Sequence, residues 1–266
     1  MPLRITCVVC ARNELAHLRI LIPHLMRQNI EIVVIDNDST DGTLDWIRSA
    51  DEAGRIEFRH LPWEGAFDLT AQLAVKGAVV ASLHSDWVIH QDADEILQGP
   101  TSWDGLRRCV EEADQAGFNV LNFDELVMLP LDPDLEDPYS NNRLFYFFEP
   151  RPLRLMRAWR RTAGLNNEHA GGHVLTGGNI YVSPVRPLLK HFIVRSQAHA
   201  RQKYLARIFA VRDLEKGWHG NRIGLTEAVL KLPVDDARLT LLPEPQSTPN
   251  PMPNPIDQHF WEWRRP

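Results

Sequence analysis

The first hundred residues alternate short apolar runs with longer stretches in which apolar residues recur every three or four positions. Each short run predicts a buried strand, and each longer stretch predicts an amphipathic helix. The predicted strands are residues 5–9, 32–35, 56–61 and 87–90. The predicted helices are residues 13–27, 43–50 and 69–83. This alternation favours a mostly parallel, Rossmann-type sheet flanked by helices, which is an α/β fold.

The pattern is less regular beyond residue 100. Strands are predicted at residues 119–128, 153–156 and 179–182, and helices at residues 103–116 and 198–215. An Asp- and Pro-rich loop is predicted at residues 131–140, and Gly217 is expected to cap the last helix. Pro23 lies inside the first predicted helix, where it predicts a kink or an early break.

The end of the chain is rich in proline. From Pro233 onward, 8 of 34 residues are proline, and they occupy every second position from 249 to 255. Proline cannot sustain a helix or a central strand, so this tail is expected to lie extended on the surface. Three aromatic residues, Phe260, Trp261 and Trp263, are candidates to anchor it.

Composition is that of a globular protein, with 44% hydrophobic and 24% charged residues. The net charge of −6 gives no reason to expect a nucleic acid or an anionic membrane as partner, because both favour basic surfaces. The longest apolar stretch, residues 73–83, is about half a membrane span and contains Lys76, so no transmembrane segment is expected.

Three cysteines allow at most one disulfide, which favours a cytoplasmic location. Cys7 and Cys10 form a C-x-x-C pair, but positions three apart in a strand face opposite ways. We therefore interpret both as core residues.

Polar clusters follow three of the predicted strands. They are ARNE at residues 11–14, DNDSTDGT at residues 36–43 and HQDADE at residues 90–95. Ligands of open α/β sheets bind where the carboxyl ends of the strands converge. Some of these residues could instead cap the following helix, and Asp38 and Ser39 are candidates for that role.

Asp92 and Asp94 are the strongest candidates for chemistry. In an extended segment, residues two apart point the same way, so both carboxylates could face one cation. Mg²⁺ and Mn²⁺ prefer oxygen ligands and are often held by one or two carboxylates together with substrate phosphates. The spacing alone is common in loops, so its weight comes from the strand that precedes it.

Together these segments resemble the family 2 glycosyltransferases with the GT-A fold. The resemblance rests on VCARNE at residues 9–14, DNDSTDGT at residues 36–43 and WVIHQDADE at residues 87–95, in that order. It implies a nucleoside-diphosphate-sugar donor, preferably a UDP-sugar, with Mn²⁺ or Mg²⁺ and inversion at the anomeric carbon. It also implies that Asp36 contacts the donor base and that Arg12 and Glu14 line the nucleoside pocket. Asp92 would approach the ribose or the metal, and Asp94 would ligate the metal.

The resemblance continues more loosely through RLMR at residues 154–157, GGH at residues 171–173 and KHFIVRS at residues 190–196. It suggests His173 as a third metal ligand and His191 as a residue against donor or acceptor. Arg195 and Lys203 would bind diphosphate oxygens. Each could equally be an ordinary surface or helix residue. His169 and His173 also have the spacing of a helical zinc pair, but Gly171 and Gly172 between them disfavour a helix.

On the same resemblance, residues 1–100 form the nucleotide-sugar-binding half and residues 101–230 an irregular acceptor-binding half of one GT-A domain. Residues 231–266 form the Pro-rich extension. Glu168 is the preferred catalytic base, with Asp124 and Glu125 as rivals. The acceptor, which could be a sugar, a lipid or a protein, is not indicated.

Two other functions stay open. A nucleotidyltransferase would carry a Gly-rich basic loop after the first strand, where this chain has ARNE. A non-catalytic module that binds a nucleotide sugar would keep the fold without turnover.

The first hundred residues place only Arg12 as a cation at a strand end. A diphosphate needs more positive charge than this, so the second half is expected to fold back over the donor. His173, Arg195 and Lys203 should then lie near Asp94.

Overall fold

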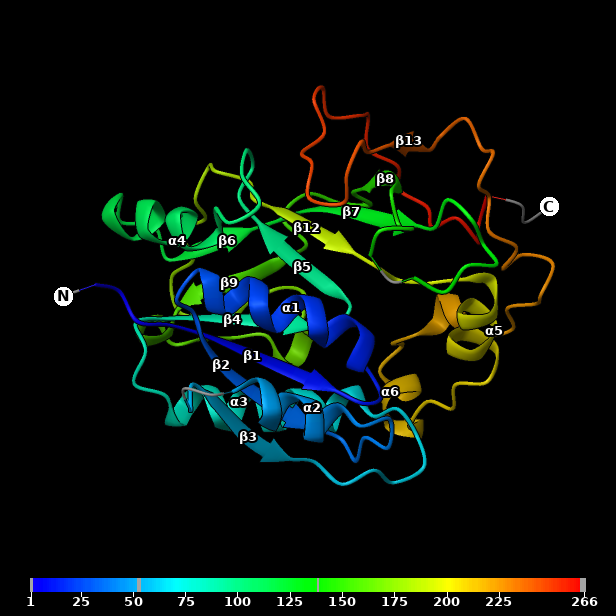
Figure 1. The fold of residues 1–266 in the computed structure, drawn as a ribbon. Helices are drawn as coiled ribbons and strands as arrows, with labels where there is room; N and C mark the ends of the chain where they lie inside the picture. Colours follow the sequence, from blue (N-terminus) through cyan, green and yellow to red (C-terminus); the bar gives the residue numbers. More distant parts are fainter. Residues whose placement is uncertain (1, 52–53, 138, 264–266) are drawn as a thin grey trace.

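The computed structural model describes residues 2–51, 54–137 and 139–263. Two β-sheets lie at its centre (Figure 1). The larger sheet has the strand order β3-β2-β1-β4-β9-β6. Its strands are β1 (Ile5–Ala11), β2 (Glu31–Asp36), β3 (Ile56–His60), β4 (Trp87–Asp92), β6 (Val120–Asn122) and β9 (Met156–Arg160). The first four are parallel, and β9 runs antiparallel to β4 and β6.

Helices cover both faces of the parallel part. They are α1 (Leu15–Arg27), α2 (Thr43–Ala50) and α3 (Leu69–Ser82). Alternate residues of β1 separate the two sides: Val9 packs in one core cluster with Leu21 of α1, and Val8 packs in another with Val79 of α3. The predicted α/β fold with a mostly parallel sheet is therefore confirmed. The early break at Pro23 does not occur, because α1 continues to Arg27.

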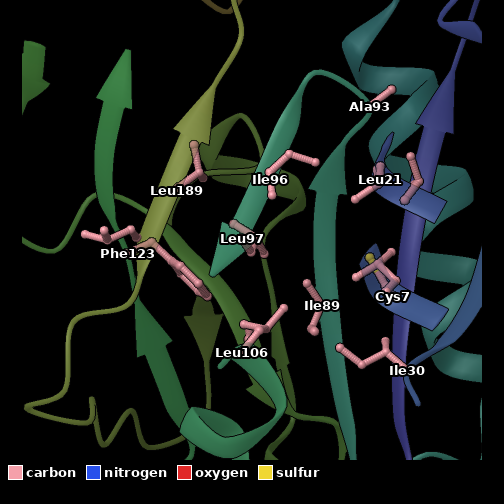
Figure 2. Close-up of a cluster of buried hydrophobic side chains, with 14 of the residues drawn as sticks. Cys7, Leu21, Ile30, Ile89, Ala93, Ile96, Leu97, Leu106, Phe123 and Leu189 are labelled. Carbon is pink, nitrogen blue, oxygen red and sulfur yellow. The ribbon is translucent and has the colours of Figure 1, made fainter. Parts of the chain in front are cut away.

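The smaller sheet has the order β13-β8-β7-β12-β5. Its strands are β5 (Glu95–Gln98), β7 (Asp124–Leu129), β8 (Leu144–Phe148), β12 (Leu188–His191) and β13 (Thr240–Leu241). The chain passes from the larger sheet to the smaller one at the turn between β4 and β5. Side chains from both sheets share one core, in which Ile89 of β4 and Leu97 of β5 lie with Leu189 of β12 (Figure 2).

The strand predictions beyond residue 100 were partly wrong. The single strand predicted at residues 119–128 is two strands, β6 and β7, in different sheets. Phe123 between them is buried in the shared core. The apolar pattern therefore continues without a break from β6 to β7 and does not show where one strand ends and the next begins. The strand predicted at 153–156 lies instead at Met156–Arg160, and 179–182 forms only the isolated bridge from Val182 to Val120. Strands β5, β8 and β12 were not predicted.

The helix predicted at residues 198–215 is two helices, α5 (Gln197–Leu205) and α6 (Val211–Glu215). Phe67 separates them: its N–H donates to the carbonyl of Ile208 at 2.8 Å, and its carbonyl accepts from the N–H of Ala210 at 2.9 Å. These contacts take the groups that a continuous helix would use. Gly217 does follow the end of α6 in a left-handed conformation, with φ of 74°, as predicted.

The remaining elements are one helix of ten residues and five shorter elements. They are α4 (Leu106–Gln115), η1 (Arg161–Ala163), β10 (Leu165–Asn166), η2 (Glu168–Ala170), β11 (Thr176–Gly177) and η3 (Gly220–Arg222). No helix in the described part of the chain has the length and apolar character needed to cross a membrane.

The described part of the Pro-rich tail contains no helix and follows the smaller sheet. Its strand β13 pairs with the edge strand β8, and Ile256 bridges to Phe148. Phe260 and Trp261 are buried in a second core cluster, where the Trp261 ring lies 5.0 Å from that of Tyr204 on α5. The tail therefore packs against both β8 and α5.

Candidate active site

A cavity of about 690 Å³ opens at the carboxyl ends of β1 and β4. Eight of the ten predicted site residues line it: Arg12, Glu14, Asp92, Asp94, His173, His191, Arg195 and Lys203. The second half of the chain thus meets the first at this edge of the sheet, as expected. A further cavity of about 630 Å³, between residues 133–134, α5 and residues 227–236, is lined by none of the ten.

Asp92 and Asp94 lie at the turn where the chain passes from the larger sheet to the smaller one. Asp92 ends β4, and Asp94 lies in the turn before β5 rather than in extended chain. Ala93 between them is buried in the shared core (Figure 2). Both residues line the cavity, although the backbone there is a turn.

Two buried cations hold Asp92. Lys76 of α3 donates to its Oδ1 at 3.2 Å, and Arg157 of β9 donates to its Oδ2 at 3.1 Å. Lys76 and Arg157 are 3% and 1% exposed. Desolvation would raise the pKa of Asp92, but these two cations hold it well below its usual range. The carboxylate is therefore anionic at neutral pH.

Asp94 is held from the second half of the chain. Lys203 of α5 donates to its Oδ2 at 2.5 Å, and His191 Nε2 lies 3.5 Å from the same oxygen. His191 also contacts Glu125 through Nδ1 at 2.6 Å, and Glu125 accepts from Arg154. Burial would lower the pKa of His191, but the two carboxylates raise it to about 10. His191 is thus a cation at neutral pH and cannot serve there as a general base.

Arg157 links the acidic turn to the Gly171-Gly172 segment. Its Nη2 donates to Glu95 Oε1 at 2.6 Å, and its Nη1 donates to the carbonyl of Gly172 at 3.0 Å. Gly172 has a φ of 80°, and a Cβ there would lie 3.1 Å from the His90 ring. Glycine is therefore required at position 172, which brings His173 to the cavity wall.

Arg12 joins the loops on the nucleoside side. It donates to the carbonyls of Asn37 and Asp38, and its guanidinium lies 4.0 Å from the centre of the Trp63 ring. Asp38 accepts from the N–H of Trp63 at 2.7 Å and does not cap α2, whose N-cap is Gly42. The alternative role of Asp38 and Ser39 as helix caps is therefore wrong.

Asp36 is 3% exposed and is not part of the cavity lining. Its Oδ2 accepts from the N–H of Ser39 at 3.1 Å, which stabilises the loop. Its Oδ1 is buried and has no hydrogen-bond partner among the described residues. A buried carboxylate oxygen without a donor is costly, so this atom is ready to accept from a ligand.

Glu168 lies outside the cavity wall. Its carboxylate packs on Gly77 of α3, where a Cβ would lie only 2.0 Å from Oε1. Glu14 takes a more central position than expected: it lines the cavity with one-fifth of its side chain exposed. Burial, and then the charge of Asp94, raise the pKa of Glu14 to about 7.

Lys76 and Arg157 were not identified from the sequence as functional residues. Lys76 is the single charged residue of the apolar helix α3, and Arg157 lies in the interior strand β9. Lys76 lies inside the predicted apolar helix at residues 69–83, and a charge at a position predicted to be buried needs a partner, which is the signal that could have identified it. Arg157 lies just beyond the strand predicted at residues 153–156, so the apolar pattern gave no such signal for it.

The sequence of residues 6–119 matches the family described as Glycosyl transferase family 2. This segment contains the three motifs of the first half of the chain. No curated protein matches the sequence.

Solved structures resemble the chain at low sequence identity. TarS 1-349 from S. aureus has a TM-score of 0.48 and 14% identity over 76% of this chain and 64% of its own. The same protein in complex with UDP-GlcNAc has a TM-score of 0.44 and 15% identity over 60% and 46%. Glucosyl-3-phosphoglycerate synthase from Mycobacterium tuberculosis, with Mn²⁺, UDP and glucosyl-3-phosphoglycerate, has a TM-score of 0.35 and 16% identity over 64% and 63%. The matches span less than two thirds of each of these proteins.

We expect Arg157→Met to lower the free energy of unfolding by about 3–5 kcal/mol, because Glu95 would be buried without its cation and Asp92 would keep only Lys76. Arg160→Met, on the same strand, removes a partly exposed ion pair with Asp114 and should cost at most about 1 kcal/mol. Urea unfolding at neutral pH measures both. Equal effects would show that the Arg157 network does not stabilise the fold.

Proposed function

We propose that the chain, whose residues 6–119 match the family described as Glycosyl transferase family 2, transfers a sugar from a nucleoside-diphosphate donor to an acceptor hydroxyl. The observation that carries the proposal is that two carboxylate residues, Asp92 and Asp94, line one cavity together with Lys and Arg residues from the second half of the chain. A UDP-sugar is the preferred donor.

The positive charge for the diphosphate comes from the second half of the chain. Arg195, Lys203 and the protonated His191 all line the cavity beside Asp94. Arg195 can bind two phosphate oxygens with its planar fork, and Lys203 acts as a point charge. In the structure Lys203 pairs with Asp94 and Arg195 with Glu136, at 2.5 Å and 3.0 Å. Both pairs would rearrange when a diphosphate competes for the cations.

The residues present fit a divalent cation. Asp92 and Asp94 offer the hard oxygen donors that Mn²⁺ and Mg²⁺ prefer. Within the described residues, no three His, Cys, Asp or Glu side chains are grouped so that they could hold a metal ion. His173 therefore does not complete a preformed ligand set, and donor phosphates would supply the remaining ligands. When bound, the cation would neutralise charge that develops on the leaving diphosphate.

The nucleoside would bind on the opposite side of the cavity, between the loops after β1 and β3. The Trp63 ring, fixed by Arg12, lines this end. Asp36 Oδ1 is buried and has no hydrogen-bond partner among the described residues, and it would accept a hydrogen bond from a base N–H. Because Asp36 does not line the cavity, the loop at residues 36–43 would move to bring its carboxylate to the base.

Glu14 is the preferred catalytic base in place of Glu168. Four carboxylates line the cavity: Glu14, Asp92, Asp94 and Glu95. The last three are paired with Lys or Arg. Glu14 instead lies 3.8 Å from His17, whose pKa burial lowers to about 3, so that this imidazole is neutral. Glu14 can therefore take the proton of the acceptor hydroxyl. The hydroxyl oxygen attacks the anomeric carbon, and the bond from that carbon to the nucleoside diphosphate breaks. A single displacement of this kind inverts the configuration of that carbon.

Asp94→Asn should reduce sugar transfer by at least about 100-fold, because the cavity loses a charge that holds the cation and positions Lys203. Chelation of divalent cations should have a similar effect on the wild type. The assay measures release of UDP from a panel of UDP-sugars. Asp257→Asn, at an exposed position of the tail, is the matched control and should keep full activity. Full activity of Asp94→Asn would refute the assignment.

Glu14→Gln should lower kcat by about 100- to 10,000-fold and change KM for the donor little, since a base acts on the acceptor proton. The pKa of Glu14 is raised to about 7, so the carboxylate becomes available as pH rises through 7. The kcat of the wild type should therefore rise across that range, and the residual kcat of the variant should not. A rise that persists in Glu14→Gln would assign it to another group.

Asp36→Ala should weaken UDP binding by roughly 10- to 100-fold, the effect of losing a hydrogen bond of about 1.5–3 kcal/mol to a charged group. Pyrophosphate, which has no base, is the control ligand and should bind with unchanged affinity. Titration calorimetry measures both. An equal loss for the two ligands would show that Asp36 only supports the loop through Ser39.

A further inference from the structure

Two arginines of the cavity, Arg207 and Arg222, have no carboxylate partner. Six Lys and Arg residues line the cavity, and the other four are paired with oxygen atoms of the protein. These four are Arg12, Arg157, Arg195 and Lys203. Within the described part of the chain, the guanidinium groups of Arg207 and Arg222 form neither an ion pair nor a hydrogen bond.

Aromatic rings hold both of these guanidinium groups. That of Arg207 lies 4.9 Å from the centre of the Phe67 ring, and that of Arg222 lies 5.7 Å from the centre of the Tyr204 ring. Phe67 and Tyr204 line the cavity as well. A ring face attracts a cation but does not accept the hydrogen bonds that its N–H groups can donate in their own plane. These donors therefore remain available to the oxygen atoms of a ligand.

The two arginines also repel each other. Burial lowers the pKa of Arg207, and the charge of Arg222 lowers it further. Glu14 and Asp94 oppose this with smaller effects, and neither is paired with Arg207. Arginine keeps its proton in proteins, so both side chains remain charged at neutral pH. An anion bound at the pair would relieve the repulsion.

The pair lies on the segment that follows α5, on the open side of the cavity. Ile208, next to Arg207, lines the cavity and is 66% exposed. Figure 1 shows α5 and α6 at the end of the molecule toward which β1 and β12 point. Burial and Asp94 raise the pKa of Glu14, whereas Lys203 and then Arg207 lower it, so Arg207 acts on the proposed base. An acceptor that enters from this side passes Arg207 before it reaches Glu14.

The diphosphate of the donor has cations of its own. In the proposed function, Arg195, Lys203 and the protonated His191 surround it, together with a divalent cation. A diphosphate that joins a nucleoside to a sugar carries one negative charge on each phosphate, which these groups already match. The remaining two cations, Arg207 and Arg222, therefore indicate a second anionic group in the same cavity.

We propose that Arg207 and Arg222 bind an anionic group of the acceptor, either a phosphate or a carboxylate. This inference rests on the proposed transfer function, because only that function defines an acceptor. An arginine fork binds two oxygen atoms of such a group at once, which orients the acceptor as well as attracting it. The hydroxyl that receives the sugar is then directed to Glu14. A neutral acceptor would leave both arginines without a partner and is disfavoured.

Equilibrium dialysis of the full chain against radioactive inorganic phosphate tests the proposal. UDP and Mg²⁺ are present at saturation, so that the cations assigned to the diphosphate are occupied. Phosphate should still bind to the wild type. Arg207→Gln and Arg222→Gln should each weaken phosphate binding by roughly 10- to 100-fold, because a charged hydrogen-bonding partner is lost, and should change UDP affinity little. Dialysis against radioactive acetate distinguishes a carboxylate site from a phosphate site.

Arg212→Gln is the matched control. Arg212 lies on α6 between the two arginines in the sequence, but it is exposed, pairs with Asp68 and is not part of the cavity lining. This variant should bind phosphate like the wild type. Arg222→Lys keeps the charge without the planar fork, so it should bind phosphate more tightly than Arg222→Gln. Circular dichroism verifies that each variant is folded.

Three outcomes would overturn the proposal. Neither phosphate nor acetate binds to the wild type. The glutamine variants at positions 207 and 222 bind these anions as tightly as the wild type. UDP displaces the anion, or both variants lose as much affinity for UDP as for phosphate, which would assign the pair to the donor. Absence of UDP binding would instead refute the proposed donor, and anion binding by the same variants would still show whether the two arginines form an anion site.

Discussion

The structure depends on the pairing of charges at the turn between β4 and β5. Asp92 and Glu95 share Arg157, Asp92 also takes Lys76, and Asp94 takes Lys203. A buried charge without a partner costs several kcal/mol, so these carboxylates and cations must meet for the chain to fold around them. The acidic residues lie within four positions of one another, whereas their partners come from α3, β9 and α5. The turn therefore determines how these distant elements are arranged.

At the same turn the chain passes from the larger sheet to the smaller one. The site therefore lies where the two sheets meet. Ala93 enters the shared core while its neighbours face the cavity. Arg157 continues the network to the Gly171-Gly172 segment, and His191 continues it to Glu125 and Arg154. Asp92, which Lys76 and Arg157 hold from two sides, needs little reorganisation when charge develops on a leaving group. The ion pairs that stabilise the fold and the groups that would act on a donor are thus largely the same residues.

The segment that closes the cavity has two different sides. Arg207 and Trp218 line the cavity, and Val211 and Ile223 face solvent. The continuous helix predicted there would have placed residues 206–210 on a helical path. The hydrogen bonds to Phe67 prevent this and create both the wall and the aliphatic surface.

The sequence by itself determined the parallel half of the fold and the acidic edge of the site. Strands β1 to β4 and helices α1 to α3 repeat a short pattern of apolar residues, and their polar ends lie at one edge because parallel strands end together. The splitting of residues 119–128 between two sheets, the break before α6 and the roles of Lys76 and Arg157 were decided only by the tertiary structure. In each case the deciding contact joins residues far apart in the chain: Phe123 with the core between the sheets, Phe67 with Ile208, and Arg157 with Asp92 and Glu95. Local periodicity reports which side chains are buried, but it does not report which partner satisfies a buried hydrogen bond or charge, because that depends on how distant segments pack.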